Sequence, residues 1–490
     1  MKKIISVLLT LVLVVSIFTT TAFGATSGDF TYTILSETEK TCKVTAYNGS
    51  AKDVVIPDKL GGYKVTSIEI LTFYMNKALS VQLPATVSSL NGQAFNEMNS
   101  TVNSITVAED SPYYTSVDGV LYNKDKTSLV CYPAGKSDET YTVLEGVELI
   151  EYYSFTSSLN LKEIILPKSL KTIEDWAFNN CKALTKINLP DGLVSIGASA
   201  FRTCRALEEV SVPDSVTFID VAAFYDCSGM KTITLSNNTE TIYGATFSGC
   251  SSLKKITIPQ SVKTILSQAF YGCDSLTEIT IPDSVTVLED AFHECDGLER
   301  VILSGNLTTL ESFTFNGCDA LKTVVVPNSI VDIEEKVFYN CKDYLIICDD
   351  NTAAKTYCIN NTVSYILNSE DTQVDLASER IYRCVTGQKV NEIVFGSDDI
   401  TCSANAVYAG TGVVLNIMKN GTLHSQYTLI VEGDINGDSA VDVLDASVVS
   451  LVANNHTTLT DAYFLAGDTN ADEEITAEDY TQIVNLALAD

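Results

Sequence analysis

Apolar residues recur along the chain at two nested periods. Within short segments such as "LTKINLP" they alternate, which places Ile187 and Leu189 on one face and Lys186 and Asn188 on the other. Related segments, "LEEVSVP", "LKKITIP" and "LTEITIP", return about every 23 residues. The pattern predicts one short strand per repeat, with the apolar face of every strand turned toward a shared core.

Three residue columns keep the same register through the repeats. Phe recurs in steps of 23 residues with a single step of 22, at Phe155, Phe178, Phe201, Phe224, Phe247, Phe270, Phe292, Phe315 and Phe338. Cys follows three residues after all but the first, at Cys181, Cys204, Cys227, Cys250, Cys273, Cys295, Cys318 and Cys341. Pro forms the third column, at Pro167, Pro190, Pro213, Pro259, Pro282 and Pro327. A fixed period of roughly 20–29 residues with one strand each predicts a leucine-rich-type solenoid with a parallel sheet.

The position of the cysteine column predicts buried thiols rather than disulfides. One Cys per coil, three residues after a core Phe, fits a ladder of small apolar side chains, and pairing neighbours would distort the stack. A metal is not expected there, because the column offers no tetrahedral clamp. The pairs Cys348/Cys358 and Cys384/Cys402 are conceivable disulfides, while Cys42 and Cys131 stay unassigned.

The repeat resembles the BspA-like leucine-rich repeats of bacterial surface and secreted proteins. The pattern "AF..C..L..I.LP.SV..I" stands in the chain many times, and "VDGVLYNKDKTSLVCYPAGK" resembles an insert that such proteins carry between repeat blocks. The resemblance covers Asp29–Ile366 and implies a solenoid over residues 25–366, with an N-terminal cap and an insert near 110–136. It also implies recognition of a partner that varies widely within the family.

Two outward columns line the exposed face of the predicted sheet. They mix charges with Thr and Ile and contain no aromatic residue, so this face is a poor platform for sugars and suits a protein ligand better. The alternative, in which Thr simply favours strands on a solvated face, stays open. The columns are Glu163, Lys186, Glu209, Thr232, Lys255, Glu278, Arg300, Thr323 and Ile165, Asn188, Ser211, Thr234, Thr257, Thr280, Ile302, Val325.

The first residues predict export from the cell. Lys2 and Lys3 precede an apolar stretch, Ile4–Phe18, and small residues follow near Gly24, as in a signal peptide spanning residues 1–24. The alternative is an uncleaved anchor, although the stretch is shorter than the roughly 20 residues that span a bilayer. We therefore expect a secreted, extracellular protein, or one held at the cell surface through a scaffold.

Beyond residue 366 the period is lost. "NTAAKTYCINNTVSYIL" predicts a polar helix that caps the stack, and "KVNEIVF", "GVVLNIM" and "YTLIVEG" predict strands, with a hairpin turn at Asn420-Gly421. We expect a small β spacer module over residues 367–432.

Two acidic stretches, "DINGDSAVDVLD" and "DTNADEEITAED", predict a duplicated calcium loop. Each is twelve residues long and carries oxygen ligands at the first, third, fifth, ninth and twelfth places, with a backbone carbonyl at the seventh, which is the spacing of a calcium loop. Close carboxylates repel unless a cation lies between them, so two calcium ions are expected. The ligands are Asp434, Asn436, Asp438, Ala440, Asp442, Asp445 and Asp468, Asn470, Asp472, Glu474, Thr476, Asp479.

A helix is predicted after each loop but not before it. This duplicated loop-helix over residues 433–490 resembles a type I dockerin, the module through which secreted proteins bind cohesin modules of a cellulosome scaffold. Ser439 and Glu473 replace the usual Gly at the sixth place, and the helices lack basic residues. The pairs Val443-Leu444 and Ala477-Glu478 differ between the halves, which predicts a single orientation on the partner.

The net charge narrows the partners further. With 31 basic and 62 acidic residues the chain carries −31, so neither nucleic acid nor membrane insertion is expected. Three His residues stand apart from any candidate nucleophile, so we do not expect an enzyme. The sequence favours a binding protein: a solenoid for an unknown protein ligand and a dockerin-like tail for cohesin. The alternatives are an adhesin with a purely structural calcium tail and, less favoured, a polysaccharide-acting enzyme within residues 368–432.

Overall fold

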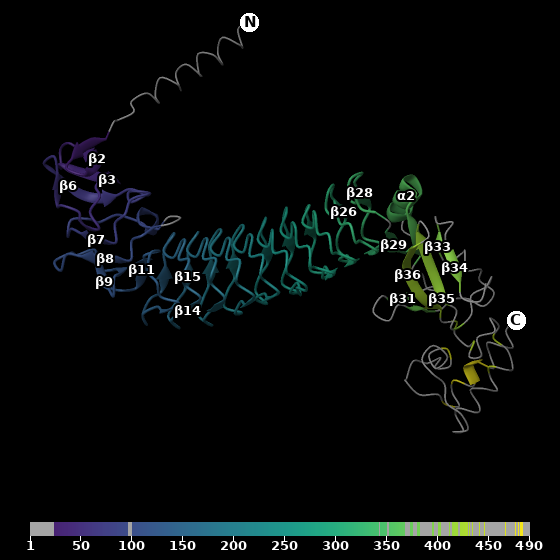
Figure 1. The fold of residues 1–490 in the computed structure, drawn as a ribbon. Helices are drawn as coiled ribbons and strands as arrows, with labels where there is room; N and C mark the ends of the chain where they lie inside the picture. The colour runs from purple at the N-terminus through teal and green to yellow at the C-terminus, as the bar shows by residue number, and fades with distance from the viewer. Residues whose placement is uncertain are drawn as a thin grey trace, which may run out of the picture. The chain divides into compact units, whose positions relative to one another are not determined.

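The computed structural model describes residues 24–96, 100–342, 344–349 and 352–367 (Figure 1). Beyond them it describes the strands given below and the residues Thr411, Val431, Asp434, Val441, Asp445, Ala466, Thr476, Asp479 and 481–483. The predicted signal peptide lies outside the described residues, apart from Gly24. The chain divides into two compact units, Met1–Ser236 and Asn237–Asp490, and each is described separately.

The first unit begins with a five-stranded sheet. Its order is β1 (Ala25–Ser27), β2 (Phe30–Ser36), β3 (Thr41–Tyr47), β6 (Tyr63–Ile68) and β5 (Lys59–Leu60). The β3–β6 pair is parallel, as coils require, whereas the other pairs are antiparallel. Rings stack behind this sheet from Phe30 through Tyr47 and Phe73 to Phe95, with centroids 5.2 to 5.7 Å apart. The sheet therefore caps the first coils and leaves no open apolar end.

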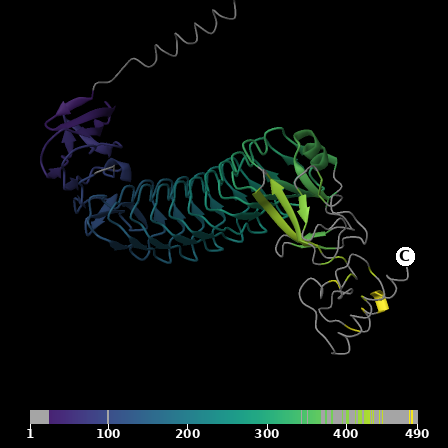
Figure 2. The ribbon, with the colours of Figure 1, turned by 45° about the vertical axis from the view of Figure 1, so that its right-hand side comes forward.

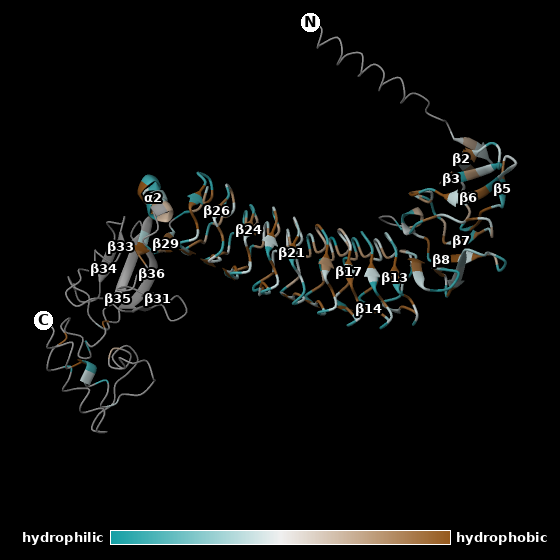
Figure 3. Ribbon diagram, turned by 180° about the vertical axis from the view of Figure 1, so that it is seen from behind, coloured by the Kyte–Doolittle hydropathy of each residue, from teal (hydrophilic) through white to brown (hydrophobic). Residues whose placement is uncertain are grey.

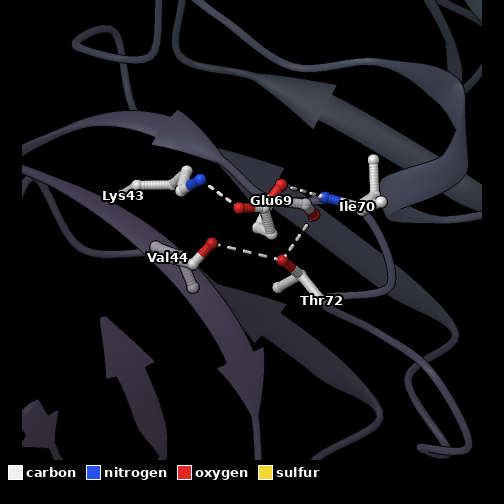
Figure 4. A network of polar contacts seen from close by, with 5 residues as sticks. All are labelled: Lys43, Val44, Glu69, Ile70 and Thr72. Carbon is white, nitrogen blue, oxygen red and sulfur yellow. Dashed lines mark hydrogen bonds and ion pairs between the residues drawn. The ribbon is translucent and has the colours of Figure 1, made fainter. Parts of the chain in front are cut away.

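A polar network ties β3 to the turn that follows β6 (Figure 4). The ammonium of Lys43 contacts a carboxylate oxygen of Glu69, and the other oxygen accepts the backbone N–H of Ile70. The hydroxyl of Thr72 donates to the carbonyl oxygens of Val44 and Glu69. The hydrogen bond from Lys43 lowers the pKa of Glu69, so this contact stabilises the cap above the acid range and weakens as the pH falls through that pKa.

The predicted insert is part of the stack. β9 (Tyr114–Val117), β10 (Val120–Asn123) and β11 (Ser128–Cys131) form an antiparallel meander, and β11 then pairs in parallel with β13 (Leu149–Ile150). Tyr132 takes the place of a column Phe, stacking on Phe155 with centroids 5.2 Å apart. Upstream, a three-stranded parallel sheet holds β4 (Asp53–Val55), β7 (Ser80–Leu83) and β8 (Ser104–Val107), and the 3-10 helix η1 spans Gly92–Ala94.

From residue 137 to 236, two parallel ladders run through the first unit (Figures 1 and 2). The longer strands are β12 (Thr140–Thr142), β14 (Glu163–Ile165), β16 (Lys186–Asn188), β18 (Glu209–Ser211) and β20 (Thr232–Thr234). The second ladder continues from β13 through β15 (Thr172–Ile173), β17 (Ser195–Ile196) and β19 (Phe218–Ile219). Ile164 pairs with Ile187, a shift of one repeat, so the sequence period is the register of the sheet.

The second unit also contains parallel ladders. The shorter strands pair as β21 (Thr241–Ile242), β22 (Thr264–Ile265) and β24 (Val287–Leu288), and separately as β26 (Thr309–Leu310) with β28 (Asp332–Ile333). Another sheet holds β23 (Glu278–Thr280), β25 (Arg300–Ile302), β27 (Thr323–Val326), β29 (Leu345–Cys348), β30 (Ser364–Leu367) and β33 (Val394–Phe395). The helix α2 (Thr352–Asn361) joins β29 to β30, where the sequence predicts a capping helix.

The ladder does not stop at the predicted edge of the solenoid. β33, which falls within the predicted spacer, pairs antiparallel with β30, so the edge of the parallel sheet is covered by a strand of the next segment. A separate five-stranded sheet follows, in the order β31 (Gln373–Asp375), β32 (Arg380–Tyr382), β36 (Thr422–Leu429), β35 (Val414–Lys419) and β34 (Ile400–Cys402). The strands predicted there are present, and one of them belongs to the solenoid sheet.

The Phe column forms a continuous stack of rings within each unit. Neighbouring centroids lie 4.9 to 5.7 Å apart with nearly parallel planes, and all of these rings except Phe338 are fully buried. Apolar and polar segments alternate along the coils, as the colouring by hydropathy shows (Figure 3). The parallel-strand solenoid predicted from the period is confirmed.

The cysteine column does more than fill space. Thiols of the ladder donate to the carbonyl oxygen of the column Phe one coil earlier, at 2.9 to 3.3 Å, in the pairs Cys181–Phe155, Cys204–Phe178, Cys227–Phe201, Cys273–Phe247, Cys295–Phe270, Cys318–Phe292 and Cys341–Phe315. These carbonyls face the core, where an S–H donor fits and a larger polar group does not.

The predicted thiol state of the ladder is confirmed, since its cysteines carry no disulfide. Burial raises the pKa of Cys204 and Cys273 well above the ordinary range, and raises that of Cys295 to about 12. Cys358 is a free buried thiol, so the structure does not form the conceivable Cys348–Cys358 bridge. The Cys384/Cys402 side chains lie outside the described residues.

Replacing Cys273 separates its hydrogen bond from its volume. Cys273→Ala removes the donor to Phe247 and leaves a small void, so we expect a loss of about 1–2 kcal/mol in the free energy of unfolding by urea. Cys273→Ser keeps a donor and should lose less than Cys273→Ala. A serine variant that is less stable than the alanine variant would show that the column is purely apolar packing.

Alkaline pH should destabilise the ladder. Cys295 has its pKa raised to about 12 in the folded chain, so its stabilising contribution is complete below the unfolded thiol pKa of about 8.5 and is lost as the pH rises toward 12. For each pH unit above about 9, the free energy of unfolding of the unchanged chain should therefore fall by about 1.4 kcal/mol more than that of Cys295→Ser. Urea unfolding at several pH values measures the slope, and equal slopes would contradict a buried neutral thiol.

Candidate functional site

The outer face of the longer strands is polar and its charges are paired between coils. Lys186 bonds to Glu163 at 2.6 Å and Lys255 to Glu278 at 3.2 Å, each across one repeat. A hollow of about 620 Å³ lies beside Lys186 and Glu209. Such exposed pairs contribute little stability, and they also leave the face without a strong field of either sign.

One residue of the predicted outward columns is not exposed. Thr323 on β27 is only 4% exposed, so its assignment to the solvent face is wrong. The neighbouring β29 and the helix α2 belong to the end of the stack, where the chain no longer follows the repeat pattern. The rest of the two columns is exposed or partly exposed.

Aromatic side chains gather on the opposite edge of the coils, at the turns around the Phe column. In the second unit Tyr271, His293, Phe313 and Tyr339 come from successive coils, and we name this set the turn-side stripe. In the first unit Trp176 stacks on Tyr153 at 6.0 Å, and the Arg202 guanidinium lies over Trp176 and Tyr225.

The sequence carries the signal for these rings. They occupy the positions one residue after and two residues before the column Phe, so the same 23-residue register that predicts the core also predicts a variable column beside it. The outward columns of the strands are the surface that the sequence pattern predicts for binding, and the turn-side stripe lies outside them.

Three carboxylates of the predicted calcium loops are fully buried. Asp434 and Asp445, at the first and last places of loop one, and Asp479, at the last place of loop two, are each 0% exposed. A buried carboxylate is costly unless it is bonded or faces a cation, and the segment from Gly433 to Asp490 contains no Lys or Arg. Burial of these groups in so acidic a segment fits a bound divalent cation.

The first loop is tied to the preceding β segment. A carboxylate oxygen of Asp434 accepts the backbone N–H of Thr411 at 2.9 Å. The Thr411 hydroxyl bonds to the backbone of Val431, and the Asp434 N–H donates to the Val431 carbonyl. Thr411 was not among the predicted site residues, because nothing in its own sequence context marks it.

The end of the second loop begins a helix. Oδ2 of Asp479 accepts the backbone N–H of Thr476 at 2.8 Å and its hydroxyl at 3.0 Å. This is a capping box, in which the third helical residue returns a bond to the N-cap residue. The predicted ninth and twelfth ligands are thus brought together at a helix start, and Ile483 of the same helix is fully buried.

The remaining predicted residues lie outside the described part of the chain. They are the ligands Asn436, Asp438, Ala440, Asp442, Asp468, Asn470, Asp472 and Glu474 and the partner-binding residues Val443, Leu444, Ala477 and Glu478. Among the described residues alone, no cluster of three metal-binding side chains is present. The donor set is all oxygen, which suits calcium, so the residues fit the expected ion.

Fold and site together define a repeat-solenoid protein that carries an acidic module after the repeats. The model for the BspA type leucine rich repeat region matches residues 22–118, 135–250 and 219–345 in six copies. The chain therefore belongs to the BspA-type leucine-rich repeat family. The model for the dockerin type I domain matches residues 432–486, which identifies the acidic segment as a dockerin.

Solved structures that resemble the chain are bacterial leucine-rich repeat proteins. A leucine-rich repeat protein from Eubacterium ventriosum shares 25% identity with a TM-score of 0.35, and the match covers 59% of this chain but only 64% of that one. A leucine rich cell surface protein from Faecalibacterium prausnitzii shares 24% identity with a TM-score of 0.29, covering 57% and 94%. No match was found among curated proteins.

The two families set the class of function. Both are non-catalytic interaction modules, type I dockerins bind calcium and cohesins, and proteins that carry these modules are typically extracellular or surface-associated. Within the described residues, no helix is both long enough and apolar enough to span a membrane.

The capping box gives a test of the second loop. Thr476→Val removes the hydroxyl and should destabilise the last helix by about 1 kcal/mol in chelator, while Thr476→Ser should be near neutral. If Thr476 is also a ligand, Thr476→Val should weaken calcium binding as well. Hydrogen exchange of the segment after residue 476, with and without calcium, separates the two roles, and unchanged exchange in both conditions would contradict both.

Proposed function

We propose that this chain is a secreted, non-catalytic binding protein that is attached to a scaffold. Its solenoid, over residues 25–366, recognises a protein ligand, and its dockerin, over residues 433–490, binds a cohesin module of a cellulosome-type scaffold. Residues 367–432 link the two. The observation that carries the proposal is the union of a BspA-type repeat region and a type I dockerin in one chain.

Calcium would organise the dockerin. Two ions would be held by the oxygens of Asp434, Asn436, Asp438, Asp442 and Asp445 in the first loop and by the matching places of the second, with carbonyls from Ala440 and Glu474. The ions would supply positive charge between carboxylates that otherwise repel. The full burial of Asp434, Asp445 and Asp479 supports this arrangement.

Export would precede assembly. The basic start and the apolar stretch Ile4–Phe18 support removal of a signal peptide near Gly24. Attachment through cohesin would then place the solenoid at a scaffold outside the cell. The pairs Val443-Leu444 and Ala477-Glu478 would face the cohesin, and their difference between the halves supports one orientation.

A free or surface-attached adhesin is the second candidate. It is favoured by one observation, the absence of basic residues from the dockerin helices, since such residues often contact cohesins. In that case the calcium module would serve stability alone.

Calcium should be required for cohesin capture by the mature full-length chain. We expect titration calorimetry to find two sites, the first loop tighter because it has four carboxylate ligands against three. Binding stabilises the module by about 4 kcal/mol at a thousandfold excess over the dissociation constant. Asp434→Ala with Asp438→Ala should abolish the first site and lower capture by immobilised cohesin.

The control is Asp461→Ala, which removes an acidic residue between the loops and should leave both sites intact. Capture that persists in chelator would contradict calcium dependence. Two tight calcium sites without capture by any cohesin type would refute the scaffold proposal and favour the adhesin.

A further inference from the structure

The turn-side stripe is a partly exposed aromatic surface built from successive coils, and Tyr339 is its most exposed ring. Tyr271 meets His293 edge-on at 5.3 Å, His293 stacks on Phe313 at 6.5 Å, and Phe313 meets Tyr339 edge-on at 6.5 Å. Tyr339 is 54% exposed, although the neighbouring column Phe338 is buried. Contiguous aromatic side chains at a protein surface are typical of interaction sites.

Carboxylates border the stripe along both sides of each coil. Those that precede it along the chain are Glu289, Asp290, Glu311 and Glu334, and those that follow it are Asp274, Glu294 and Asp296. Burial and the nearby negative charges of Glu289 and Glu334 raise the pKa of Glu311, and burial with Asp296 and Glu294 raises that of Asp274. Glu311 and Asp274 are therefore repelled by neighbouring carboxylates, and a cationic partner would relieve that repulsion.

The chain itself already places a cation on the stripe. The ammonium of Lys336 lies 5.4 Å from the centre of the Phe313 ring. In the first unit the Arg202 guanidinium lies 4.0 Å from the Tyr225 ring centre. That pair stands one residue after the column Phe, whereas Lys336 and Phe313 stand two residues before it. Rings of these columns thus present their faces to a Lys or Arg side chain.

A hollow at the end of the stripe adds a place for a long side chain. It has a volume of about 370 Å³ and is lined by Glu335, Tyr339 and Tyr357 among others. The lining also includes Lys342, whose charge is paired with Asp319 at 2.8 Å. The tyrosine rings and the Glu335 carboxylate are therefore left to receive an ammonium or guanidinium group.

We propose that the turn-side stripe binds a lysine- or arginine-rich segment of a protein partner, and that Lys336 occupies the Phe313 ring face until the partner replaces it. This rests on the proposed protein recognition by the solenoid and names its surface and the chemistry of its ligand. The sheet face is the weaker site, because its charges are already paired between coils.

A carbohydrate is the competing ligand for an aromatic surface. The rings of the stripe cover one another's faces in part, which leaves little flat ring area for a sugar, and the carboxylate border offers it no added attraction. The observations therefore favour a cationic peptide, and the carbohydrate becomes an arm of the test.

The experiment uses the mature full-length chain and a fluorescein-labelled peptide of alternating arginine and glycine, in about 150 mM salt, where long-range attraction is screened. The matched peptide has citrulline in place of arginine, which keeps the shape and removes the charge. We expect the arginine peptide to bind at least tenfold more tightly. Equal affinity for the two peptides would overturn the proposal.

Two substitutions locate the binding. Tyr339→Leu keeps an apolar side chain and removes the ring, so affinity should fall about two- to fivefold. Tyr74→Leu changes a tyrosine that is equally exposed, at 54%, but lies in the N-terminal unit, and it should change nothing. Equal losses in the two variants would show general attraction to an acidic protein and overturn the assignment to the stripe.

Lys336→Ala gives the opposite sign, because removing the resident cation should tighten arginine-peptide binding about two- to fivefold. Weaker binding in this variant would contradict the displacement step. Glu311→Gln in the border should weaken binding, while Glu209→Gln on the sheet face should not. The reverse result would move the site to the sheet face and overturn the assignment to the stripe.

Competition by a β-glucan hexasaccharide at the stripe would show a carbohydrate surface and overturn the proposal. Cohesin capture is measured on the same variants. In the unchanged chain, peptide binding without cohesin capture refutes scaffold attachment and leaves the stripe standing, whereas cohesin capture without peptide binding refutes the stripe alone.

Discussion

The hydrogen bonding of one coil to the next is the constraint on which the rest of the structure depends. Each turn buries carbonyl oxygens that accept one hydrogen bond from their own coil and a second from the next coil. The Phe247 carbonyl accepts the backbone N–H of Cys250 and the thiol of Cys273. The thiol bond links the Phe column of one coil to the Cys column of the next, so the two columns keep a common register, and Cys295 still donates to Phe270 across the single 22-residue step.

Periodicity alone could predict the fold because every contact in a solenoid is between neighbours one repeat apart. It could not predict where that rule is broken. Tyr132 replaces a column Phe inside the insert, Thr323 is buried near the end of the sheet, and β33 returns from beyond the repeats to cover β30. Each of these depends on a chain segment that is distant in sequence, and no local pattern encodes such a contact.

The metal site shows the same division between local and distant information. The spacing of oxygen side chains within each loop is local, so candidate ligand positions can be predicted from the sequence. The bond from Thr411 to Asp434 joins residues 23 apart across the preceding segment, and only the structure reveals it. The cysteine column is visible in the sequence, but its predicted burial does not indicate that the sulfur also donates a hydrogen bond to a backbone carbonyl.

The core residues and the residues of the turn-side stripe occupy separate columns of the same repeat. Because Phe and Cys hold the register, positions such as those of His293 and Phe313 are free to carry any side chain that the turn tolerates. The acidic residues that gather there and in the dockerin are excess charge that the chain does not neutralise with its own 31 basic residues. We propose that neutralisation comes from outside the chain, by a metal ion where the carboxylates are buried and by a basic segment where they border the turn-side stripe.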